Sequence, residues 1–503
     1  MGKAVGIDLG TTYSAIAILG ESGKAEILAN RDGERTTPSV VYFQDDGSVL
    51  VGTMAKRSAA VAPLDVVDFV KRQMGNPDWR FDAANGRQLS PEEVSALILK
   101  RLKEDAELYL GEGAVTDAVI TVPAYFDDAK RRATKDAGRI AGLNVLRVLN
   151  EPTAAALAYG EEARKDGTIL VFDLGGGTFD VTVMTITNDV YDVKATDGLH
   201  ELGGKDWDDR LMTWLNQQFQ NEGGPDLTET FESEADLREK AEAAKRTLSQ
   251  APSTKVILSS GGVTKSIPVS REQFESITVD LLNQARDLTI SLVEETGLGW
   301  AGIDHVLLVG GSIKMPMVAR MLEEISGRPP LRAGNPDELV ALGAGIQAAI
   351  EAPSAGTPRP RAIIKDVTSQ GLGVAVLADD GSGRLVNSII IPRNTKIPAK
   401  GSDAFTTSVE GQTEVHVQVT QGDDEDFAFV KEIGDQLLTI PPYPKGAPIR
   451  VEFAYDIDQM VSIAVYDLTT DSLLGSFEVD NTANLSDEDI RTATDNNNDT
   501  EVG

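Results

Sequence analysis

Two short segments far apart in the chain place an aspartate, glycines and hydroxyl side chains in the same order. Asp8 is followed by Leu9-Gly10-Thr11-Thr12, and Asp173 is followed by Leu174-Gly175-Gly176-Gly177-Thr178. Each aspartate ends a run of apolar residues typical of a buried strand. Glycines let backbone N–H groups approach anionic oxygens that a larger side chain would keep away. Each segment therefore predicts a phosphate-binding turn that carries a carboxylate.

A carboxylate beside a phosphate is favourable when a cation lies between them, and Mg²⁺ is the cation that suits oxygen ligands of both kinds. Two such turns predict two related lobes that close on one nucleoside triphosphate. A third apolar run ends in Gly310-Gly311-Ser312 and is placed to support the nucleoside. Each glycine pair alone is also typical of an ordinary strand-to-helix turn, so the prediction depends on the ordered set.

The composition favours a folded chain of two or three domains, with 503 residues and 41% hydrophobic residues. The formal charge of −32 opposes binding to nucleic acid and to anionic membranes. The chain has no cysteine, which excludes disulfides and thiolate chemistry, and we assign no chemistry to its three scattered histidines. The sequence enters its first strand without a signal-peptide pattern and has no apolar run of about 18 residues, so we expect a cytoplasmic protein.

The pattern of apolar residues divides the chain into four parts. Residues 1–352 mix apolar strands with helical stretches, which is typical of an α/β domain, and Pro, Ser, Gly and Thr then dominate an interdomain linker at 353–365. Residues 366–482 alternate apolar and polar side chains and predict an antiparallel β-sandwich. The acidic residues 483–503 predict at most one helical turn and a disordered tail.

We expect a helix that opens at Glu151-Pro152 and ends near Gly160. Glu151 thus lies at the positive end of a helix, where it either acts in the site or only stabilises the helix dipole.

Taken in order, the motifs resemble those of the seventy-kilodalton heat-shock chaperones of the DnaK type, along nearly the whole chain. The matching segments are 7–12, 122–126 (Val-Pro-Ala-Tyr-Phe), 150–155 (Asn-Glu-Pro-Thr-Ala-Ala), 173–180 (Asp-Leu-Gly-Gly-Gly-Thr-Phe-Asp), 309–312 and 335–338. The resemblance implies an actin-like (ribonuclease H-like) two-lobed ATPase domain followed by an all-β sandwich that binds peptides.

The resemblance also implies roles for the residues of the two turns. Asp8 and Asp173 match residues that hold hydrated Mg²⁺, and Asp180 matches one that helps to bind K⁺. Lys71 matches the catalytic lysine, whose positive charge at the γ-phosphate positions water and offsets developing charge, and Glu151 orients the same water. Thr178 completes the implied catalytic set.

The remaining implied contacts to ATP or ADP come from phosphate-binding turns and from one helix face. They are Gly10, Thr11, Thr12, Gly175, Gly176, Gly177, Gly203, Gly204, Glu242, Lys245, Arg246, Ser249, Gly310, Gly311, Ser312, Lys314 and Asp337. The alternative for residues 242–249 is an ordinary charged helix face. The sequence departs from the family at Ile313-Lys314, where threonine and arginine are usual. Since lysine does not stack on adenine as a planar guanidinium does, we expect weaker nucleotide binding.

Another group matches residues that relay the nucleotide state between domains. Pro123 and Arg131 match the relay pair, while Arg147, Asn150 and Asp366 match positions that meet a J-domain co-chaperone. A nucleotide-exchange factor is a further implied partner. The linker has Ile363 and Ile364 where the family has a run of leucines, so altered coupling is expected.

In the sandwich, Leu377, Ser408, Val415 and Val417 match residues that line the peptide pocket, with plain sandwich core as the alternative. The chain ends about where the family's helical lid begins, and a short form without most of the lid predicts fast peptide exchange.

The function expected from these residues is that of an ATP-dependent chaperone that binds unfolded or partly folded polypeptides, with slow ATP hydrolysis. The first alternative is a nucleotide-dependent scaffold or regulator that binds ATP but no general client. An actin-like filament protein is disfavoured by the sandwich and the negative charge, and no substrate motif supports a sugar kinase.

Overall fold

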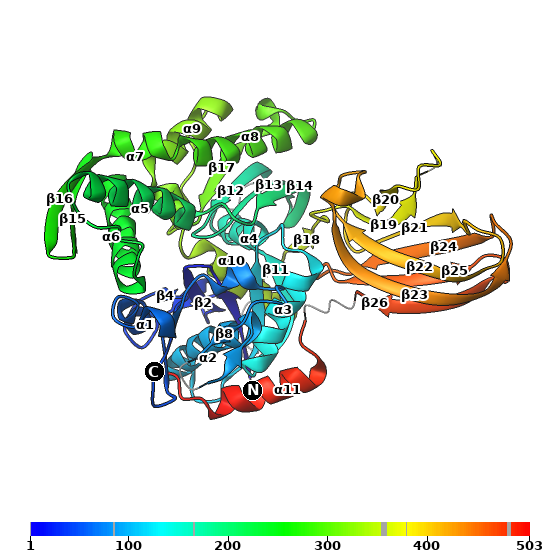
Figure 1. Cartoon of the computed structure of the whole chain (residues 1–503), viewed down its shortest axis with the longest axis horizontal. Coiled ribbons are helices and arrows are strands. Elements are labelled where there is room, and N and C mark those ends of the chain that lie inside the picture. The colour runs from blue at the N-terminus through cyan, green and yellow to red at the C-terminus, as the bar shows by residue number, and fades with distance from the viewer. Residues whose placement is uncertain (1, 84–85, 164–165, 354–359, 379, 480–483) are drawn as a thin grey trace.

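The computed structural model describes residues 2–83, 86–163, 166–353, 360–378, 380–479 and 484–503. An N-terminal part with sheets and helices is followed by a part built from strands, which extends to one side of the molecule (Figure 1). The last helix returns from the strand-rich part to the N-terminal part.

The first large sheet has the strand order β11-β10-β1-β2-β3, with β4 paired to β2. Its strands are β1 (Lys3–Asp8), β2 (Tyr13–Leu19), β3 (Ala25–Leu28), β4 (Thr37–Pro38), β10 (Val115–Val122) and β11 (Asn144–Asn150). Because β1 and β10 run parallel, as do β10 and β11, their carboxyl ends lie at one edge. Asp8 and Asn150 are the last residues of β1 and β11 and therefore lie at that edge.

The second large sheet has the order β17-β12-β13-β14-β18. Its strands are β12 (Gly167–Leu174), β13 (Phe179–Thr187), β14 (Val190–Leu199), β17 (His305–Val309) and β18 (Ile363–Lys365). Strand β12 pairs in parallel with β17, and Asp173 lies opposite Val309 near the carboxyl ends of both. The second phosphate-binding turn and the third glycine pair are therefore neighbours.

Two helices, α4 (Glu151–Ala163) and α10 (Leu339–Glu351), lie between the two large sheets. Residues from both sheets and both helices share one buried cluster, which includes Val119 of the first sheet and Val171 of the second. The helices approach closely at Gly343, where an added Cβ would lie 1.7 Å from the Ala154 carbonyl oxygen. Only glycine fits there, so the close packing of the sheets depends on it.

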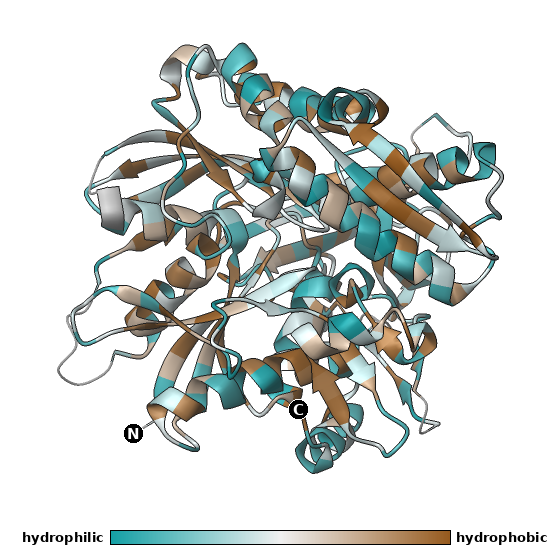
Figure 2. Cartoon of the chain, turned by 90° about the vertical axis from the view of Figure 1, so that its left-hand side faces the viewer, coloured by the Kyte–Doolittle hydropathy of each residue, from teal (hydrophilic) through white to brown (hydrophobic). Residues whose placement is uncertain are grey.

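The outer faces of the two sheets are covered by different helices. Helices α2 (Pro91–Leu110) and α3 (Asp128–Ile140) share a core with the first sheet. Another core joins the second sheet to α5 (Gly204–Asn221), α6 (Phe231–Gln250), α7 (Arg271–Ile277), α8 (Val279–Glu295), α9 (Pro316–Ser326) and the hairpin β15–β16 (Ser253–Ser260, Val263–Ser270). Figure 2 shows apolar strands running through the interior beneath more polar helices. Strands covered on both faces explain the nearly continuous apolar runs in the sequence.

Further short elements pack with the first sheet and α2. They are β5 (Val41–Phe43), β6 (Val49–Val51), α1 (Thr53–Ser58), β7 (Val66–Val67), β8 (Phe81–Asp82) and β9 (Gln88–Leu89). Strand β5 pairs with both β6 and β7, which leaves β6 at an edge of this small sheet.

The described residues between 372 and 478 form two antiparallel sheets that enclose a common core. One has the order β20-β19-β22-β23 and the other β21-β24-β25-β26. Their strands are β19 (Leu372–Leu377), β20 (Leu385–Ile391), β21 (Ala399–Thr406), β22 (Gln412–Gln421), β23 (Lys431–Tyr443), β24 (Pro448–Tyr455), β25 (Val461–Asp467) and β26 (Ser472–Glu478). We call this part the sandwich; its exact domain limits remain a prediction.

The structure differs from the sequence prediction in the linker and in the tail. Residues 354–359 of the predicted linker lie outside the described residues, and residues 363–365 are strand β18 of the second sheet. The predicted disordered tail is wrong, because residues 487–499 form helix α11 (Asp487–Asp499). Ser486 caps this helix, and Ile490 and Ala493 are buried against the core of the first sheet. This packing stabilises a segment whose composition alone resembles disorder.

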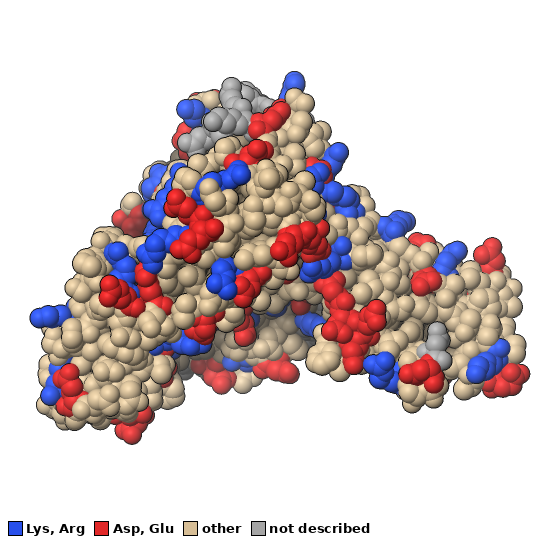
Figure 3. Space-filling model, turned by 90° about the horizontal axis from the view of Figure 1, so that it is seen from above, with Lys and Arg blue, Asp and Glu red and all other residues tan. Residues whose placement is uncertain are grey.

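Among the described residues, no helix is long and apolar enough to cross a membrane. Lys and Arg side chains are interspersed with Asp and Glu on the face drawn in Figure 3.

His200 follows β14 and is packed against two aromatic rings. Its ring centre lies 5.1 Å from that of Tyr125 and 6.0 Å from that of Phe126. Burial, with a smaller contribution from the charge of Lys130, lowers the pKa of His200 to about 4. The folded protein therefore holds this imidazole neutral at a pH at which the unfolded chain protonates it.

We expect His200 to destabilise the fold as pH falls from about 6.5 towards 4. In this range the unfolded chain binds more protons at this site, and the loss of unfolding free energy between pH 7 and 5 is about 2 kcal/mol. Urea unfolding at both pH values measures it. His200→Gln should lose about that much less stability on acidification, with the exposed His416→Gln as control; equal pH dependence in wild type and His200→Gln would contradict the prediction.

Candidate functional site

The two phosphate-binding turns predicted from the sequence meet across the space between the large sheets. A Cβ added to Gly177 would lie 2.3 Å from Cγ2 of Thr11, and one added to Gly176 would lie 2.2 Å from Oγ1 of Thr12. A Cβ added to Gly203 would lie 2.5 Å from the backbone N of Gly177. Gly176 and Gly177 thus leave room for the Thr11 and Thr12 side chains, Gly203 leaves room for the Gly177 backbone, and the segments 10–12, 175–177 and 203–204 lie side by side.

A cleft of about 730 Å³ opens beside these turns. The predicted nucleotide contacts that line it are Thr11, Thr12, Gly176, Gly204, Glu242, Lys245, Arg246, Ser249, Gly311, Ser312, Lys314 and Asp337. The predicted residues that do not line it, Gly10, Gly175, Gly177, Gly203 and Gly310, belong to the turns at its floor. The volume lies within the usual range for small-molecule sites.

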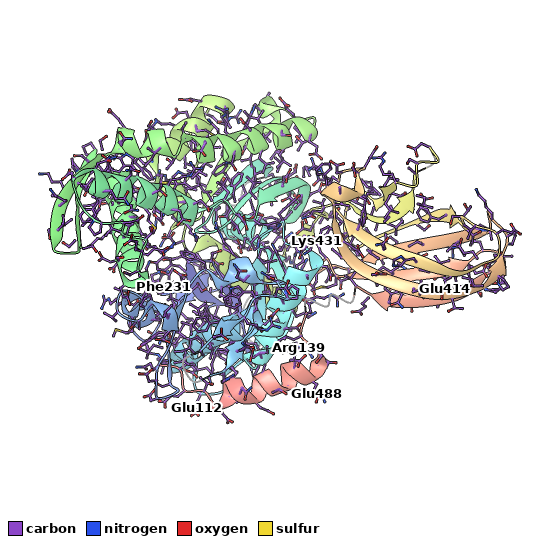
Figure 4. The ribbon with its side chains drawn as sticks, in the orientation of Figure 1. Glu112, Arg139, Phe231, Glu414, Lys431 and Glu488 are labelled. Carbon is purple, nitrogen blue, oxygen red and sulfur yellow. The ribbon has the colours of Figure 1, made fainter. Side chains whose placement is uncertain are left out.

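Helix α6 forms one wall of the cleft and is tied to the opposite wall by charged side chains. Glu242 pairs with Lys56 of α1 at 2.6 Å, and Arg246 pairs with Glu242 at 2.8 Å. The Tyr13 hydroxyl accepts hydrogen bonds from Arg246 (2.7 Å) and Lys56 (3.2 Å). Phe231, with which α6 begins, lines the outer end of the cleft (Figure 4). The sequence analysis missed Lys56 and Tyr13 because no motif marks them.

Lysine and serine side chains hold other parts of the cleft lining together through hydrogen bonds to the backbone. Lys245 donates to the Gly204 carbonyl oxygen at 2.8 Å, and Ser312 donates to the Gly175 carbonyl oxygen at 2.7 Å. Lys314 is half exposed and pairs with Asp337. This ion pair holds the ammonium group at the rim of the cleft.

Asp8, Glu151, Asp173 and Asp180 surround the buried Lys71 beside the turns, and none of these five side chains is among the residues that line the cleft. Lys71 pairs with Glu151 at 2.5 Å, and both side chains are at least nine-tenths buried. Burial, and then repulsion by Glu151, raise the pKa of Asp8 to about 7 and that of Asp180 to about 8. The same causes raise the pKa of Asp173 well above its usual range. Without a cation these carboxyl groups therefore retain protons near neutral pH, and a bound cation would favour their charged forms.

These donors fit a magnesium ion that keeps part of its water shell. Among the described residues no three His, Asp or Glu side chains are arranged to hold a metal by themselves. Mg²⁺ typically binds one or two carboxylates together with phosphate oxygens and water. Asp8 and Asp173, at the ends of β1 and β12, would supply these carboxylates.

Arg72 is a further residue that the sequence analysis missed. It donates to the Gly177 carbonyl oxygen at 2.7 and 3.0 Å and pairs with Asp206 at 2.5 Å. Since Arg72 follows Lys71 directly, its contacts connect the segment that carries Lys71 to the second phosphate-binding turn and to α5. Only its position beside Lys71 could have indicated this.

Of the predicted relay pair, Arg131 takes part in a series of hydrogen bonds that includes the Ala124–Tyr125 peptide unit. The Asp180 carboxylate accepts a bond from the Tyr125 N–H at 3.2 Å, in the turn that follows Pro123. Arg131, fully buried, donates to the Ala124 carbonyl oxygen at 3.1 Å and to the Asn150 side chain at 2.7 Å. The series thus leads from the carboxylate cluster to the end of β11.

Asn150 extends this series to the residue that follows the linker strand. Its side-chain amide donates to Asp366 at 3.0 Å, and Thr153 donates to the same carboxylate at 3.4 Å. Asn150 and Asp366 are both buried, so in this arrangement they contact each other and offer no surface to a co-chaperone. Arg147 pairs with Glu351 at 3.5 Å.

The sandwich rests on α3 through hydrogen bonds and ion pairs. The Val461 N–H donates to Asp128 at 2.9 Å, and Lys431 (Figure 4) pairs with Asp127 at 2.7 Å. Arg132 pairs with Glu478 at 2.8 Å.

A second set of contacts joins the sandwich to the second sheet and α8. Lys396 pairs with Asp192 of β14 at 2.7 Å, and Asn394 donates to Glu295 at 2.8 Å. The sandwich is therefore docked on both halves of the N-terminal part.

The predicted peptide-pocket residues lie in different environments. Leu377 is 50% exposed at the end of β19, and Ser408 is exposed. Val415 is half-buried on β22, and Val417 is buried in the sandwich core. The β19–β22 ladder runs only from Leu372 to Val374, so Leu377 lies beyond the paired part. The geometry thus favours a role in the sandwich core for Val417, and it leaves the surface near Leu377 accessible to a peptide.

Comparison with known proteins extends over almost the whole chain. The family model described as "Hsp70 protein" matches residues 4–502. The chain is 44% identical over 497 residues to the chaperone protein DnaK of Thermotoga neapolitana, an alignment that covers 97% of this chain and 82% of the relative. The family match includes the cleft, the relay residues and the sandwich, and the resemblance inferred from the motifs is confirmed. The chain belongs to the Hsp70 family.

Proposed function

We propose that ATP binding and hydrolysis in the cleft control how the sandwich binds unfolded or partly folded polypeptides. As a member of the Hsp70 family, the chain is an ATP-dependent chaperone with ATPase activity, and the family uses ATP or ADP with Mg²⁺. We assign the two large sheets, joined through α4 and α10, to the two lobes of an actin-like ATPase domain. The converging turns and the cleft between the lobes support this assignment.

One observation carries the proposal: Glu151 and Asn150 are consecutive residues with partners in different functional regions. Glu151 contacts Lys71 in the carboxylate cluster beside the turns, and Asn150 contacts Asp366 beside the linker strand. A shift of Glu151 on nucleotide binding is transmitted to Asn150 through one peptide bond. The nucleotide site and the linker are thus coupled without a long pathway.

The residues of the carboxylate cluster take the following roles in this proposal. Asp8 and Asp173 hold the magnesium ion, which neutralises phosphate charge when bound. The Lys71 ammonium group lies at the γ-phosphate, and Glu151 orients the attacking water, while the glycine turns donate backbone N–H groups to the phosphates. Asp180 is a candidate ligand for K⁺, supported by the raised pKa of its carboxyl group, which a bound cation would lower.

Family membership supports general classes of partner and no individual partner. Clients are unfolded or partly folded polypeptides, and co-chaperones act on this family generally. A J-domain contact near Arg147, a nucleotide-exchange factor and a cytoplasmic location stay predictions.

One titration distinguishes a chaperone from a scaffold that binds ATP but no general client. A fluorescent unfolded peptide is titrated with the full chain in Mg·ATP and in Mg·ADP. A chaperone binds the peptide at least tenfold more weakly in ATP, whereas a scaffold binds it in neither state. Equal, measurable affinity in both states would contradict nucleotide control.

Lys71→Ala should reduce single-turnover ATP hydrolysis by about a hundredfold or more, the effect typical of removing a transition-state charge contact. Binding of Mg·ATP should persist, because the turns and carboxylates remain. Lys130→Ala is the matched control, since Lys71 and Lys130 both lie over the Phe126 ring, at 5.8 and 5.3 Å. Hydrolysis near the wild-type rate in Lys71→Ala would assign catalysis to another residue.

The linker strand allows a comparison of two adjacent isoleucines. Ile364 packs against the core between the sheets, whereas Ile363 is 59% exposed. Ile364→Asp should undock β18 and abolish the ATP-induced change in peptide off-rate, because it replaces an apolar contact of the partly buried Ile364 with a charged group. Ile363→Asp should retain most of the change. The measurement is peptide dissociation by stopped flow, and a full response in Ile364→Asp would exclude docking through this strand.

A further inference from the structure

A residue close to Lys71 has a backbone conformation that is unusual for its type. Phe69 has φ of 53° and ψ of 21°, which is left-handed, and it precedes the 3₁₀ turn Val70–Gln73 that carries Lys71. Bulky side chains rarely adopt a positive φ, and such residues persist where other contacts hold them. The structure therefore places backbone strain beside Lys71, at a position where glycine would carry none.

The chain on either side of Phe69 is anchored in the first lobe, the one that contains the first sheet. Val67 and Val70 are both buried in the core of that sheet. With both neighbours held, the backbone angles of Phe69 set the direction of the turn that follows. They therefore also set the position of Lys71 in the carboxylate cluster.

The ring of Phe69 contacts the second lobe, the one that contains the second sheet. The Lys205 ammonium group lies over this ring, 5.4 Å from its centre, and both residues line the cleft. Lys205 belongs to the first turn of α5, and its ammonium group also pairs with Asp209 at 2.5 Å. A cation over an aromatic ring is attracted to it, more strongly where water is partly excluded, and the Lys205 side chain is only 22% exposed. This contact therefore joins the two lobes beside Lys71.

A second contact to α5 follows on the same side of the turn. Arg72 pairs with Asp206, the residue after Lys205, at 2.5 Å. Residues three apart lie on the same side of a 3₁₀ turn, so Phe69 and Arg72 both contact α5. Lys71 thus lies between two residues that contact the second lobe.

The start of α5 is joined directly to the second phosphate-binding turn. The Lys205 N–H donates to the Gly176 carbonyl oxygen at 2.8 Å, and the Gly204 N–H donates to the Gly175 carbonyl oxygen at 3.0 Å. A displacement of this phosphate-binding turn therefore displaces Lys205 and, through it, acts on the ring of Phe69.

We propose that Phe69 and Lys205 are positioning residues whose contact across the cleft holds Lys71 in place, so that Lys71 is positioned for hydrolysis only while the lobes are closed. When the lobes separate, the ammonium group leaves the ring, and the strain at Phe69 favours a backbone conformation that displaces Lys71. The inference rests on the role of Lys71 in the proposed function and adds what regulates it. Lobe closure thus controls the rate of hydrolysis through a single aromatic ring.

The contact is tested in the full chain by measuring single-turnover ATP hydrolysis and the dissociation constant for Mg·ATP. Lys205→Met removes the ammonium group and keeps an apolar stem, and Phe69→Leu removes the ring and keeps apolar bulk. Phe69→Tyr keeps the face of the ring. Lys240→Met is the matched control, because Lys240 pairs with Asp236 within α6 as Lys205 pairs with Asp209 within α5.

We expect Lys205→Met and Phe69→Leu each to slow hydrolysis about tenfold, while Phe69→Tyr and Lys240→Met hydrolyse ATP at nearly the wild-type rate. The dissociation constant should stay within about twofold of wild type, because the contact acts on the chemical step. The double variant should be no slower than the slower single variant, since one contact is lost in every case. Wild-type hydrolysis in Lys205→Met, multiplied losses in the double variant, or weaker Mg·ATP binding without slower hydrolysis would overturn the proposal.

Phe69→Gly and Phe69→Ala separate the ring from the backbone. Both remove the ring, but glycine adopts a positive φ without strain, so Phe69→Gly should unfold at a higher temperature than Phe69→Ala. Both should hydrolyse ATP as slowly as Phe69→Leu, which a purely structural role of Phe69 does not predict. Wild-type hydrolysis in Phe69→Gly would refute the role of the ring, because the backbone alone would then position Lys71.

Hydrogen exchange in Mg·ADP tests the contact without hydrolysis. The Arg72 N–H donates to the Phe69 carbonyl oxygen at 3.0 Å, and its exchange should be faster in Lys205→Met than in Lys240→Met. Equal exchange in the two variants would count against the contact. If Lys71→Ala hydrolyses ATP at the wild-type rate, the proposed role of Lys71 fails, whereas an inactive Lys71→Ala with an unslowed Lys205→Met contradicts only the present inference.

Discussion

The end of strand β11 is the constraint on which the rest of this structure depends. Asn150 and Glu151 are adjacent, and they contact partners in different regions, Asp366 after the linker strand and Lys71 in the carboxylate cluster. Asn150 ends β11 and Glu151 begins α4. Because a single peptide bond joins the two residues, a displacement of one displaces the other. In the proposed coupling, one peptide unit separates the residue that contacts Lys71 from the residue that contacts Asp366, and the buried Arg131 donates to the Asn150 side chain.

The contacts around this junction are mostly polar and buried, which has a physical consequence. Buried ion pairs and hydrogen bonds add little net stability compared with apolar packing, but a partner removed from such a network leaves an expensive unpaired group. The network therefore favours a few distinct arrangements of these side chains over a continuous range of intermediate ones. The sandwich likewise docks on α3 and β14 through ion pairs and single hydrogen bonds, an interface of the kind that opens and closes within a chain. Apolar anchors appear where the chain enters the docked sandwich, at Ile364, and where it leaves, in α11.

The sequence predicted the parts of the site whose chemistry requires particular residues in consecutive order. Aspartate followed by glycines marked both turns, and the structure brings these turns together. The α/β character of the first part and the antiparallel pairing of the sandwich followed from hydrophobic periodicity. Arg72 and Lys56 were missed because their partners lie far away in sequence, so no local pattern reveals them. The tail was predicted wrongly because a few buried side chains, not its composition, decide that α11 folds.

The central claim is that the nucleotide sets the position of the sandwich relative to the ATPase domain. The chain has no cysteine, so Glu112→Cys on the first-sheet side and Glu414→Cys on the sandwich, both exposed (Figure 4), accept spin labels without further changes. Pulsed electron spin resonance then gives the distance between the labels in the full chain. The account predicts one narrow distance in Mg·ATP, as in the docked arrangement, and a longer, broader distribution in Mg·ADP with peptide. The same distribution in both states would contradict it.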